Sequence, residues 1–269
     1  MRLFQYWDAR EPPAEVAEWI EGFRTMNPDL KHRLYDRGSA SWFIEKHLGE
    51  RERQAFDTCA VPAMQADYFR LCALVATGGV WFDADCIAGR PLSTLIEQVP
   101  QLLLVILDGG IINSTLIARA PGNPFLSACL QLSTRLIEER QYADIPQLIA
   151  VPSVAGPRLL TTVWTLAAPE WPAEGPLGRF PQPPNAWDAK LPNIRDTVQS
   201  VIAATPHVRE ALEEATFLHL ITVQQWGLPC EPRYKGGSKH WMRWNGPIYL
   251  DRPADAAETP AWSSALAVK

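Results

Sequence analysis

The sequence predicts an α/β protein with a mostly parallel sheet flanked by helices. Short apolar segments alternate with helical patterns over the first 85 residues, which is typical of a parallel sheet whose strands are connected by helices. A Gly-Gly pair then leads into an apolar strand that ends in two aspartates, Gly78 to Asp85. Polar residues at the carboxyl end of a strand mark the edge where open α/β sheets bind ligands.

Each expected element has a local signal. Residues 3–7 are apolar and aromatic and predict the first strand, and a helix follows because four apolar residues share one face: Val16, Trp19, Ile20 and Phe23. Pro62 opens a second strong helix that the Gly78-Gly79 pair ends. Further strands are expected at 34–35, 102–107 and 111–117, and further helices at 39–47 and 125–139.

The second half of the chain is expected to be less regular. The segment 168–192 is rich in proline, but Trp171, Phe180 and Trp187 give it apolar anchors, so it is interpreted as an irregular excursion of the fold and not as a linker. We expect a single domain over residues 1–253 and a flexible tail over residues 254–269.

Composition and charge narrow the class of protein. The net charge of -5 and the pI near 5.6 argue against a nucleic-acid-binding surface. Five cysteines without a Cys-x-x-Cys pair are typical of reduced thiols. The longest apolar run, residues 102–107, is too short to cross a bilayer, and residues 1–5 do not begin a signal peptide. We therefore expect a cytoplasmic protein, with peripheral contact to a membrane left open.

Asp83 and Asp85 are the strongest candidates for a site. In an extended strand they project to the same side, whereas Ala84 points to the other. Carboxylate oxygens suit a hard cation such as Mg²⁺ or Mn²⁺, which can bridge the phosphates of a nucleotide. Because Asp-x-Asp is a common pattern, the competing interpretation is a solvated turn that closes the strand.

The helix before the Gly-Gly pair adds an acid and a base. Asp67 and Arg70 are three residues apart and share a face, so they form either a local ion pair or ligands at the rim of the same cleft as Asp83. Other aromatic residues have a simpler interpretation. Among the 11 tryptophans, three are expected in the core: Trp19, Trp42 and Trp164.

Together these residues resemble the DXD-containing sugar transferases, a family that includes yeast initiating mannosyltransferases, bacterial capsular polysaccharide sugar transferases and the catalytic domains of large glucosylating toxins. The resemblance is strong over about residues 3–125. Four segments carry it, in matching order and spacing: the strand that closes on Trp7, the stretch from Trp19 to Asn27-Pro28-Asp29, the pair Ala66 to Arg70 and Gly78 to Asp85, and Pro91-Leu92.

The resemblance implies a GT-A type (Rossmann-like) fold, with a nucleotide-sugar-binding half over 1–125 and an acceptor-side half over 126–253. It implies a retaining hexosyltransferase that uses Mn²⁺ or Mg²⁺ and a UDP- or GDP-sugar, with an acceptor such as a polysaccharide or another glycan. By resemblance, Trp7 stacks on the base, Asp67 and Arg70 bind the sugar or ribose, Asn113 contacts the sugar, Asp83 contacts the donor, and Asp85 ligates the metal. The expected catalytic residues are Asp83, Asp85 and Arg70.

The third protein ligand of the metal is left open. His219 precedes Gln225-Trp226 in the order that the resemblance implies, and it joins Asp85 and Asp83 in the expected ligand set. His240, between Lys239 and Trp241, competes with it. The family more often has Ser where Gln225 stands, so this part of the chain departs from the pattern.

Two other functions fit parts of the sequence. A haloacid-dehalogenase-type phosphatase also has Asp-x-Asp after an apolar strand, with Asp83 as the nucleophile and Asp85 as the acid. That motif usually opens its domain, whereas a full α/β unit with Trp7 precedes it here. A catalytically inactive sugar-binding module would keep the fold, but the presence of both aspartates and Arg70 argues against it.

Overall fold

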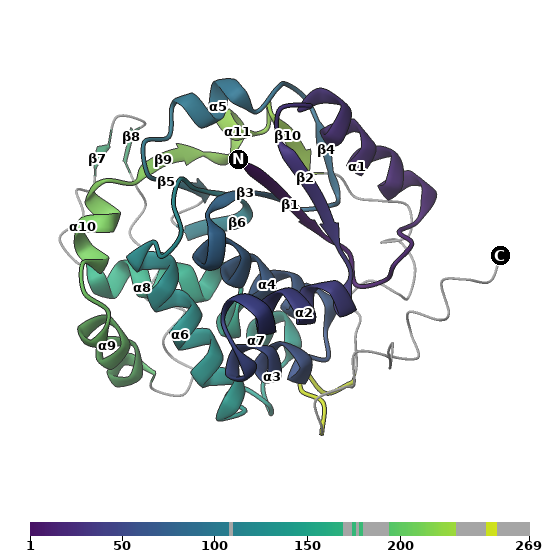
Figure 1. The fold of residues 1–269 in the computed structure, drawn as a ribbon. Coiled ribbons are helices and arrows are strands. Elements are labelled where there is room, and N and C mark those ends of the chain that lie inside the picture. Colours follow the sequence, from purple (N-terminus) through teal and green to yellow (C-terminus); the bar gives the residue numbers. More distant parts are fainter. Residues whose placement is uncertain (108–109, 169–173, 176–177, 180–193, 230–245, 252–269) are drawn as a thin grey trace.

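A six-stranded sheet forms the centre of the molecule (Figure 1), in a computed structural model that describes residues 1–107, 110–168, 174–175, 178–179, 194–229 and 246–251. The strand order is β2-β1-β3-β6-β5-β9. The bounds of the six strands are β1 Arg2–Tyr6, β2 Lys31–Tyr35, β3 Gly79–Phe82, β5 Leu102–Leu107, β6 Gly110–Ala118 and β9 Thr216–His219. Only β6 runs antiparallel to its neighbours β3 and β5, so the prediction of a mostly parallel sheet is confirmed.

Helices cover both faces of this sheet (Figure 1). Their bounds are α1 Ala14–Met26, α2 Arg37–His47, α3 Glu50–Thr58, α4 Pro62–Thr77, α5 Ser93–Glu97, α6 Pro124–Glu138, α7 Gln147–Val154, α8 Pro157–Ala167, α9 Arg195–Ala204, α10 Val208–Glu213 and α11 Leu220–Val223. The larger core lies on the α2, α4 and α6 side and includes Phe4, Phe69 and Trp81. The smaller core lies on the side of α1, α5 and α11 and includes Phe23 and Phe82.

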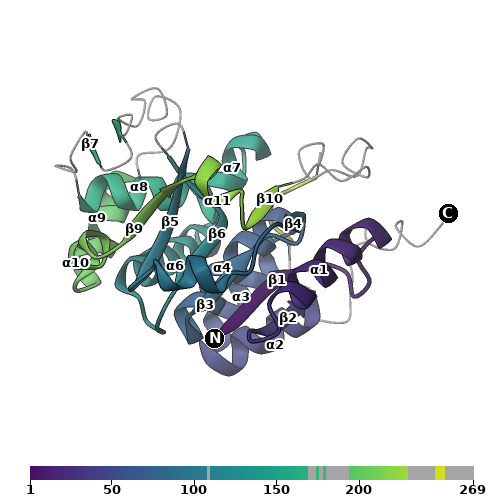
Figure 2. The same cartoon turned by 90° about the horizontal axis from the view of Figure 1, so that it is seen from above.

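Seen from above, β2 and β9 form opposite edges of the sheet (Figure 2). Two small antiparallel ribbons lie apart from it. One pairs β4 Cys86–Ala88 with β10 Gly227–Pro229, and the other pairs β7 Glu174–Gly175 with β8 Gly178–Arg179. The β4–β10 ribbon brings the C-terminal half of the chain back to the segment that directly follows Asp85.

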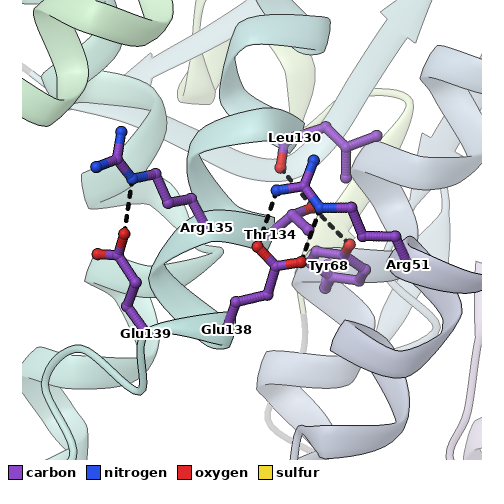
Figure 3. Close-up of polar contacts among 7 residues, drawn as sticks. All are labelled: Arg51, Tyr68, Leu130, Thr134, Arg135, Glu138 and Glu139. Carbon is purple, nitrogen blue, oxygen red and sulfur yellow. Dashed lines mark hydrogen bonds and ion pairs between the residues drawn. The ribbon is translucent and has the colours of Figure 1, made fainter.

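Polar contacts hold α4 between α3 and α6 (Figure 3). Arg51 of α3 donates two hydrogen bonds to the carboxylate of Glu138 on α6, at 2.7 and 2.8 Å. The hydroxyls of Tyr68 on α4 and Thr134 on α6 are 2.7 Å apart and buried. Since a buried hydrogen bond is costly to leave unmade, it fixes the register of α4 against α6.

The structure confirms most of the expected elements of the first half. The predicted strand at 102–107 coincides with β5, and the helix opened by Pro62 is α4. The helix expected at 39–47 begins earlier, at Arg37, because Asp36 accepts a hydrogen bond from the Ser39 N–H and caps it. Most of segment 168–192, all of tail 254–269, His240 and Cys230 lie outside the described residues.

One core assignment was wrong. Trp42 is 59% exposed, and the Lys46 ammonium lies 4.7 Å from the centre of its ring, so this tryptophan belongs to the surface of α2. Trp164 is buried as expected, and Trp19 is half-buried against the cluster formed by Val16, Ile20 and Ala84. The apolar spacing of α2 did not reveal that Trp42 lies on the outer side.

The four cysteines that the structure describes are buried thiols, and burial raises the pKa of three of them: Cys59, Cys72 and Cys129. Within the described residues, no helix combines the length and apolar character needed to cross a membrane.

The Gly78-Gly79 pair sets the entry into β3. Both residues have positive φ, +62° and +133°, a conformation that glycine adopts without steric cost. A side-chain carbon at Gly79 would lie 2.7 Å from the Phe4 ring and 2.9 Å from the Arg2 carbonyl oxygen. The close packing of β3 on β1 therefore requires glycine here.

We expect Gly79→Ala to lower the free energy of unfolding by at least about 2 kcal/mol, from backbone strain and overpacking together. Gly122→Ala is the matched control. Gly122 also has a positive φ, +71°, but no atom lies within 4 Å of the added carbon, so only the strain of about 1 kcal/mol is expected. Urea unfolding measures both, and equal losses would contradict the packing argument.

Candidate active site at the carboxyl edge of β1 and β3

The parallel strands β1 and β3 are neighbours, and the chain leaves their carboxyl ends in different directions. From β1 the chain crosses to β2 on one side, and β3 pairs with β1 on the other side. Trp7 directly follows β1, and Asp83 directly follows β3. This divergence is the topological switch point at which open α/β sheets form a ligand crevice.

The two aspartates lie in a turn, so the expectation that they extend the strand was wrong. β3 ends at Phe82, and the Cys86 N–H donates to the Asp83 carbonyl oxygen at 3.2 Å, closing a turn over Asp83 to Cys86. The Asp83 N–H still donates to the Ser114 carbonyl at 2.9 Å, which keeps Asp83 in register with β6. The turn tightens the backbone, yet the carboxylates remain close enough for Asp85 to affect the pKa of Asp83.

Arg70 links the helix α4 to this turn. Its Nη2 donates to Asp83 Oδ1 at 2.6 Å, and its Nη1 lies 3.0 Å from Asp67 Oδ1. The guanidinium is 2% exposed, and its carbon lies 4.9 Å from the centre of the Trp81 ring. A buried, doubly paired arginine of this kind differs from the surface ion pair that the i, i+3 spacing alone indicated.

Two further side chains complete a hydrogen-bonded network. The Trp81 indole N–H donates to Asp83 Oδ1 at 2.8 Å, and the Asn113 amide donates to Asp67 Oδ1 at 2.9 Å. Asn113 was expected at the site, and the structure places it there through Asp67. Trp81 was missed, although the period of two along β3 already put it on the same face as Asp83.

Burial and neighbouring charges act in opposite directions on the carboxylates. Burial raises the pKa of Asp83 to about 6, the Arg70 guanidinium opposes this, and the negative charge of Asp85 adds to it. Burial also raises the pKa of Asp67, against the effect of Arg70 and the Asn113 amide. The site thus concentrates negative charge that one arginine neutralises only in part.

Trp7 lies next to the same turn. Its ring packs in a small cluster with Val16 and Ile20 of α1 and with Ala84, the residue between the two aspartates. Its backbone N–H donates to the Tyr35 carbonyl at 2.9 Å, which extends the β1–β2 ladder past the end of β1. The half-buried indole therefore lies beside Ala84 of the motif, and its stacking on a nucleotide base stays a prediction.

His219 also lies where the strands have their carboxyl ends, but three positions away from β3 in the strand order. It ends β9, which is separated from β3 by β6 and β5, a spacing of roughly 14 Å at the level of the strands. Its Nδ1 accepts a hydrogen bond from the Ile221 N–H at 3.3 Å and caps α11. Its role as a metal ligand stays a prediction.

Asp83 and Asp85 are the two carboxylates of this turn, and their binding of a cation stays a prediction. The hydrogen bonds from Arg70 and Trp81 both end on Oδ1 of Asp83, so Oδ2 is the oxygen that can face a cation. Across the described part of the chain, no cluster of three or more His, Cys, Asp or Glu is placed to hold a metal. Two protein carboxylates suit Mg²⁺ or Mn²⁺, which commonly complete their shell with water and substrate phosphate.

Three residues outside the network shape the segments around it: Gly156, Asn27 and Trp226. A side-chain carbon at Gly156, which caps α8, would lie 2.7 Å from Asp67 Oδ2. Asn27, which belongs to one of the segments that carry the resemblance, accepts a hydrogen bond from the Leu92 N–H at 2.6 Å and so ties the end of α1 to the segment that follows β4. Trp226 is buried, and its indole N–H donates to Thr94 at 2.9 Å.

Part of the chain is similar in sequence to known glycosyltransferases. Residues 4–101 match the family model described as a glycosyltransferase sugar-binding region containing a DXD motif. The chain is 25% identical over 101 residues to the initiation-specific alpha-1,6-mannosyltransferase of Schizosaccharomyces pombe (strain 972), which is 35% of this chain and 25% of that protein. The match thus spans a quarter of the length of that relative.

Among solved structures, the PaToxG glycosyltransferase covers 93% of this chain and 88% of its own, with 12% identity and a TM-score of 0.47. The two sequence matches confirm the resemblance inferred from the motifs: residues 4–101 are similar to a glycosyltransferase sugar-binding region that contains a DXD motif.

Proposed function

We propose that this chain is a metal-dependent, retaining glycosyltransferase of the GT-A type that transfers a sugar from a nucleoside diphosphate donor to a glycan. One observation carries the proposal. The buried Asp67–Arg70–Asp83 network joins α4 to the turn after β3, directly beside Trp7 at the switch point of the sheet. The mixed sheet, with β6 as the single antiparallel strand of the six, supports the GT-A assignment.

Each part of the donor has a chemically suitable partner. The flat indole of Trp7 offers a stacking surface for the base. Asp67 and Asn113 present hydrogen-bonding groups suited to sugar hydroxyls, and they are already bonded to each other at 2.9 Å. Asp83 and Asp85 would hold Mn²⁺ or Mg²⁺, which neutralises the diphosphate when it is bound.

Arg70 supplies a positive charge that the protein itself holds in place. Its Nε and Nη1 make no hydrogen bond within the described residues, although Nη1 is in ion-pair contact with Asp67. These buried N–H groups retain donor capacity toward an oxygen of the donor. As charge develops on the leaving diphosphate, a fixed guanidinium in a water-poor site stabilises it more strongly than solvent would.

The phosphatase interpretation is disfavoured by the same contacts. A nucleophilic carboxylate needs an oxygen and a rotamer directed at phosphorus, whereas Asp83 is fixed by Arg70 and by the Trp81 indole. A structural and metal-binding role for Asp83 fits these contacts better.

The proposed function is tested by incubating the protein with UDP- and GDP-sugars and Mn²⁺ and measuring release of the nucleoside diphosphate. Slow release from one donor is expected even without the acceptor, and NMR of a transferred product gives the anomeric configuration, expected to be retained. Hydrolysis of a simple phosphomonoester, with no release from any donor, would favour the phosphatase.

Asp85→Asn should abolish metal-dependent donor binding and lower turnover by at least about 100-fold, because the amide removes the charge that a divalent cation requires. Asp144→Asn removes the same charge at an exposed position of the described chain and should have no effect. Calorimetric titration of donor with and without chelator measures binding. Full activity of Asp85→Asn in chelator would contradict the metal assignment.

Arg70→Met should both destabilise the fold and abolish turnover. Removing the guanidinium leaves two carboxylates buried without their cation, which costs about 3–5 kcal/mol. Trp81→Phe is the matched comparison, since it keeps a buried ring and removes one hydrogen bond to Asp83, for a loss of about 1 kcal/mol. Urea unfolding and donor turnover measure both variants, and equal stability of Arg70→Met and wild type would contradict the network.

A further inference from the structure

We propose that Asp8 and Arg37 form a subsite that reads the polar edge of the donor's nucleobase. The inference rests on the proposed function and names two residues that neither the motif nor the comparisons assign. The ligand chemistry is an N–H next to a C=O, the lactam edge that guanine and uracil share. Adenine and cytosine present a ring nitrogen acceptor next to an amino group, which reverses this order.

The backbone brings the two residues together next to Trp7. The Trp7 N–H donates to the Tyr35 carbonyl at 2.9 Å, so the chain after β1 runs beside the chain after β2. Asp8 is the next residue on one side, and Arg37 is the first residue of α2 on the other. Neighbouring strands are about 4.8 Å apart, within reach of an arginine side chain.

Both side chains have buried polar atoms that the described protein does not satisfy. Arg37 is 5% exposed, and its Nη2 donates to the Asp57 carbonyl at 2.9 Å, but Nε and Nη1 have no hydrogen-bond partner among the described residues. Asp8 Oδ2 is also covered and without such a partner there. Three such atoms on two electrostatically coupled residues are unusual, because each costs about 1–3 kcal/mol when it is left unpaired.

The charges of the pair influence each other. Burial raises the pKa of Asp8 to about 7, and the nearby Arg37 guanidinium opposes that rise. Arg37 is fixed by Asp57, whose own carboxylate is held by Arg53 at 2.8 Å. The guanidinium is therefore held in place, whereas Asp8 is half-buried, and contact with a bound base would require its carboxyl to rotate about the Cα–Cβ bond.

The Asp8 carboxylate is a hydrogen-bond acceptor next to the Arg37 donor, and this order determines which ligand edge can bind. A phosphate would be repelled by the Asp8 carboxylate, whereas a lactam edge places its N–H on Asp8 and its C=O on Arg37. The position next to the Trp7 ring favours a base over a ribose, because a base stacked on that indole directs its edge sideways in the plane of the ring. Adenine and cytosine would set their acceptor nitrogen against the carboxylate.

The test is calorimetric titration of the full chain with GDP, UDP, ADP and CDP in the presence of Mn²⁺. Wild-type protein is expected to bind GDP or UDP at least about tenfold more tightly than ADP and CDP, which is the penalty for one mismatched buried polar group. Whichever of GDP and UDP binds with the higher affinity identifies the base. Asp8→Ala should weaken that nucleotide about tenfold and change ADP and CDP by less than about threefold.

Asp29→Ala is the control, because it removes the same charge from an exposed position and should leave all four affinities unchanged. Arg37→Met provides a second variant, with thermal melting to verify folding; if it does not fold, Asp8→Ala decides. Equal binding of all four nucleotides by wild type, or an equal loss for all four in Asp8→Ala, would show that the pair holds only water and overturn the subsite. Binding of none of the four would overturn the proposed function as well.

Discussion

The buried ion pair between Arg70 and Asp83 is the interaction on which the candidate site depends. It joins the middle of α4 to the turn after β3 across 2.6 Å, with the guanidinium almost completely removed from water. Such a pair stabilises little by itself, since desolvation cancels most of the attraction. Its value is positional: the guanidinium is held by Asp67 as well, and the Trp81 indole donates to the same Asp83 oxygen, so the Asp83 carboxylate keeps one orientation.

The surrounding fold is built to hold that geometry. Tyr68, between Asp67 and Arg70 on α4, is tied to Thr134 of α6, and the Arg51–Glu138 pair joins α3 to α6 outside it. On the strand side, Gly79 allows β3 to approach β1 closely, and Asp83 remains bonded to β6 through Ser114. Rigid elements thus support both ends of the network, as expected for a preorganised site.

The sequence by itself determined the alternation of strands and helices and the polar residues at the strand ends, because hydrophobic period and Gly or Pro signals act locally. β5 and α4 were predicted at their observed positions, and local signals together with the family resemblance named seven candidate site residues: Asp67, Arg70, Asp83, Asp85, Asn113, Trp7 and His219. Periodicity did not show that Trp42 faces solvent, since a helical stripe does not say which neighbours cover it.

Only the tertiary structure decided how the residues act together. That Asp67 and Arg70 form a buried network with Asp83, and that Trp81 donates to that carboxylate, depends on the packing of α4 against the sheet. The placement of Asp83 beside β6 and the proximity of Asp8 to Arg37 follow from the pairing of strands distant in sequence. Local signals fix the type of each element, whereas contacts between elements fix the distances and burial on which the chemistry depends.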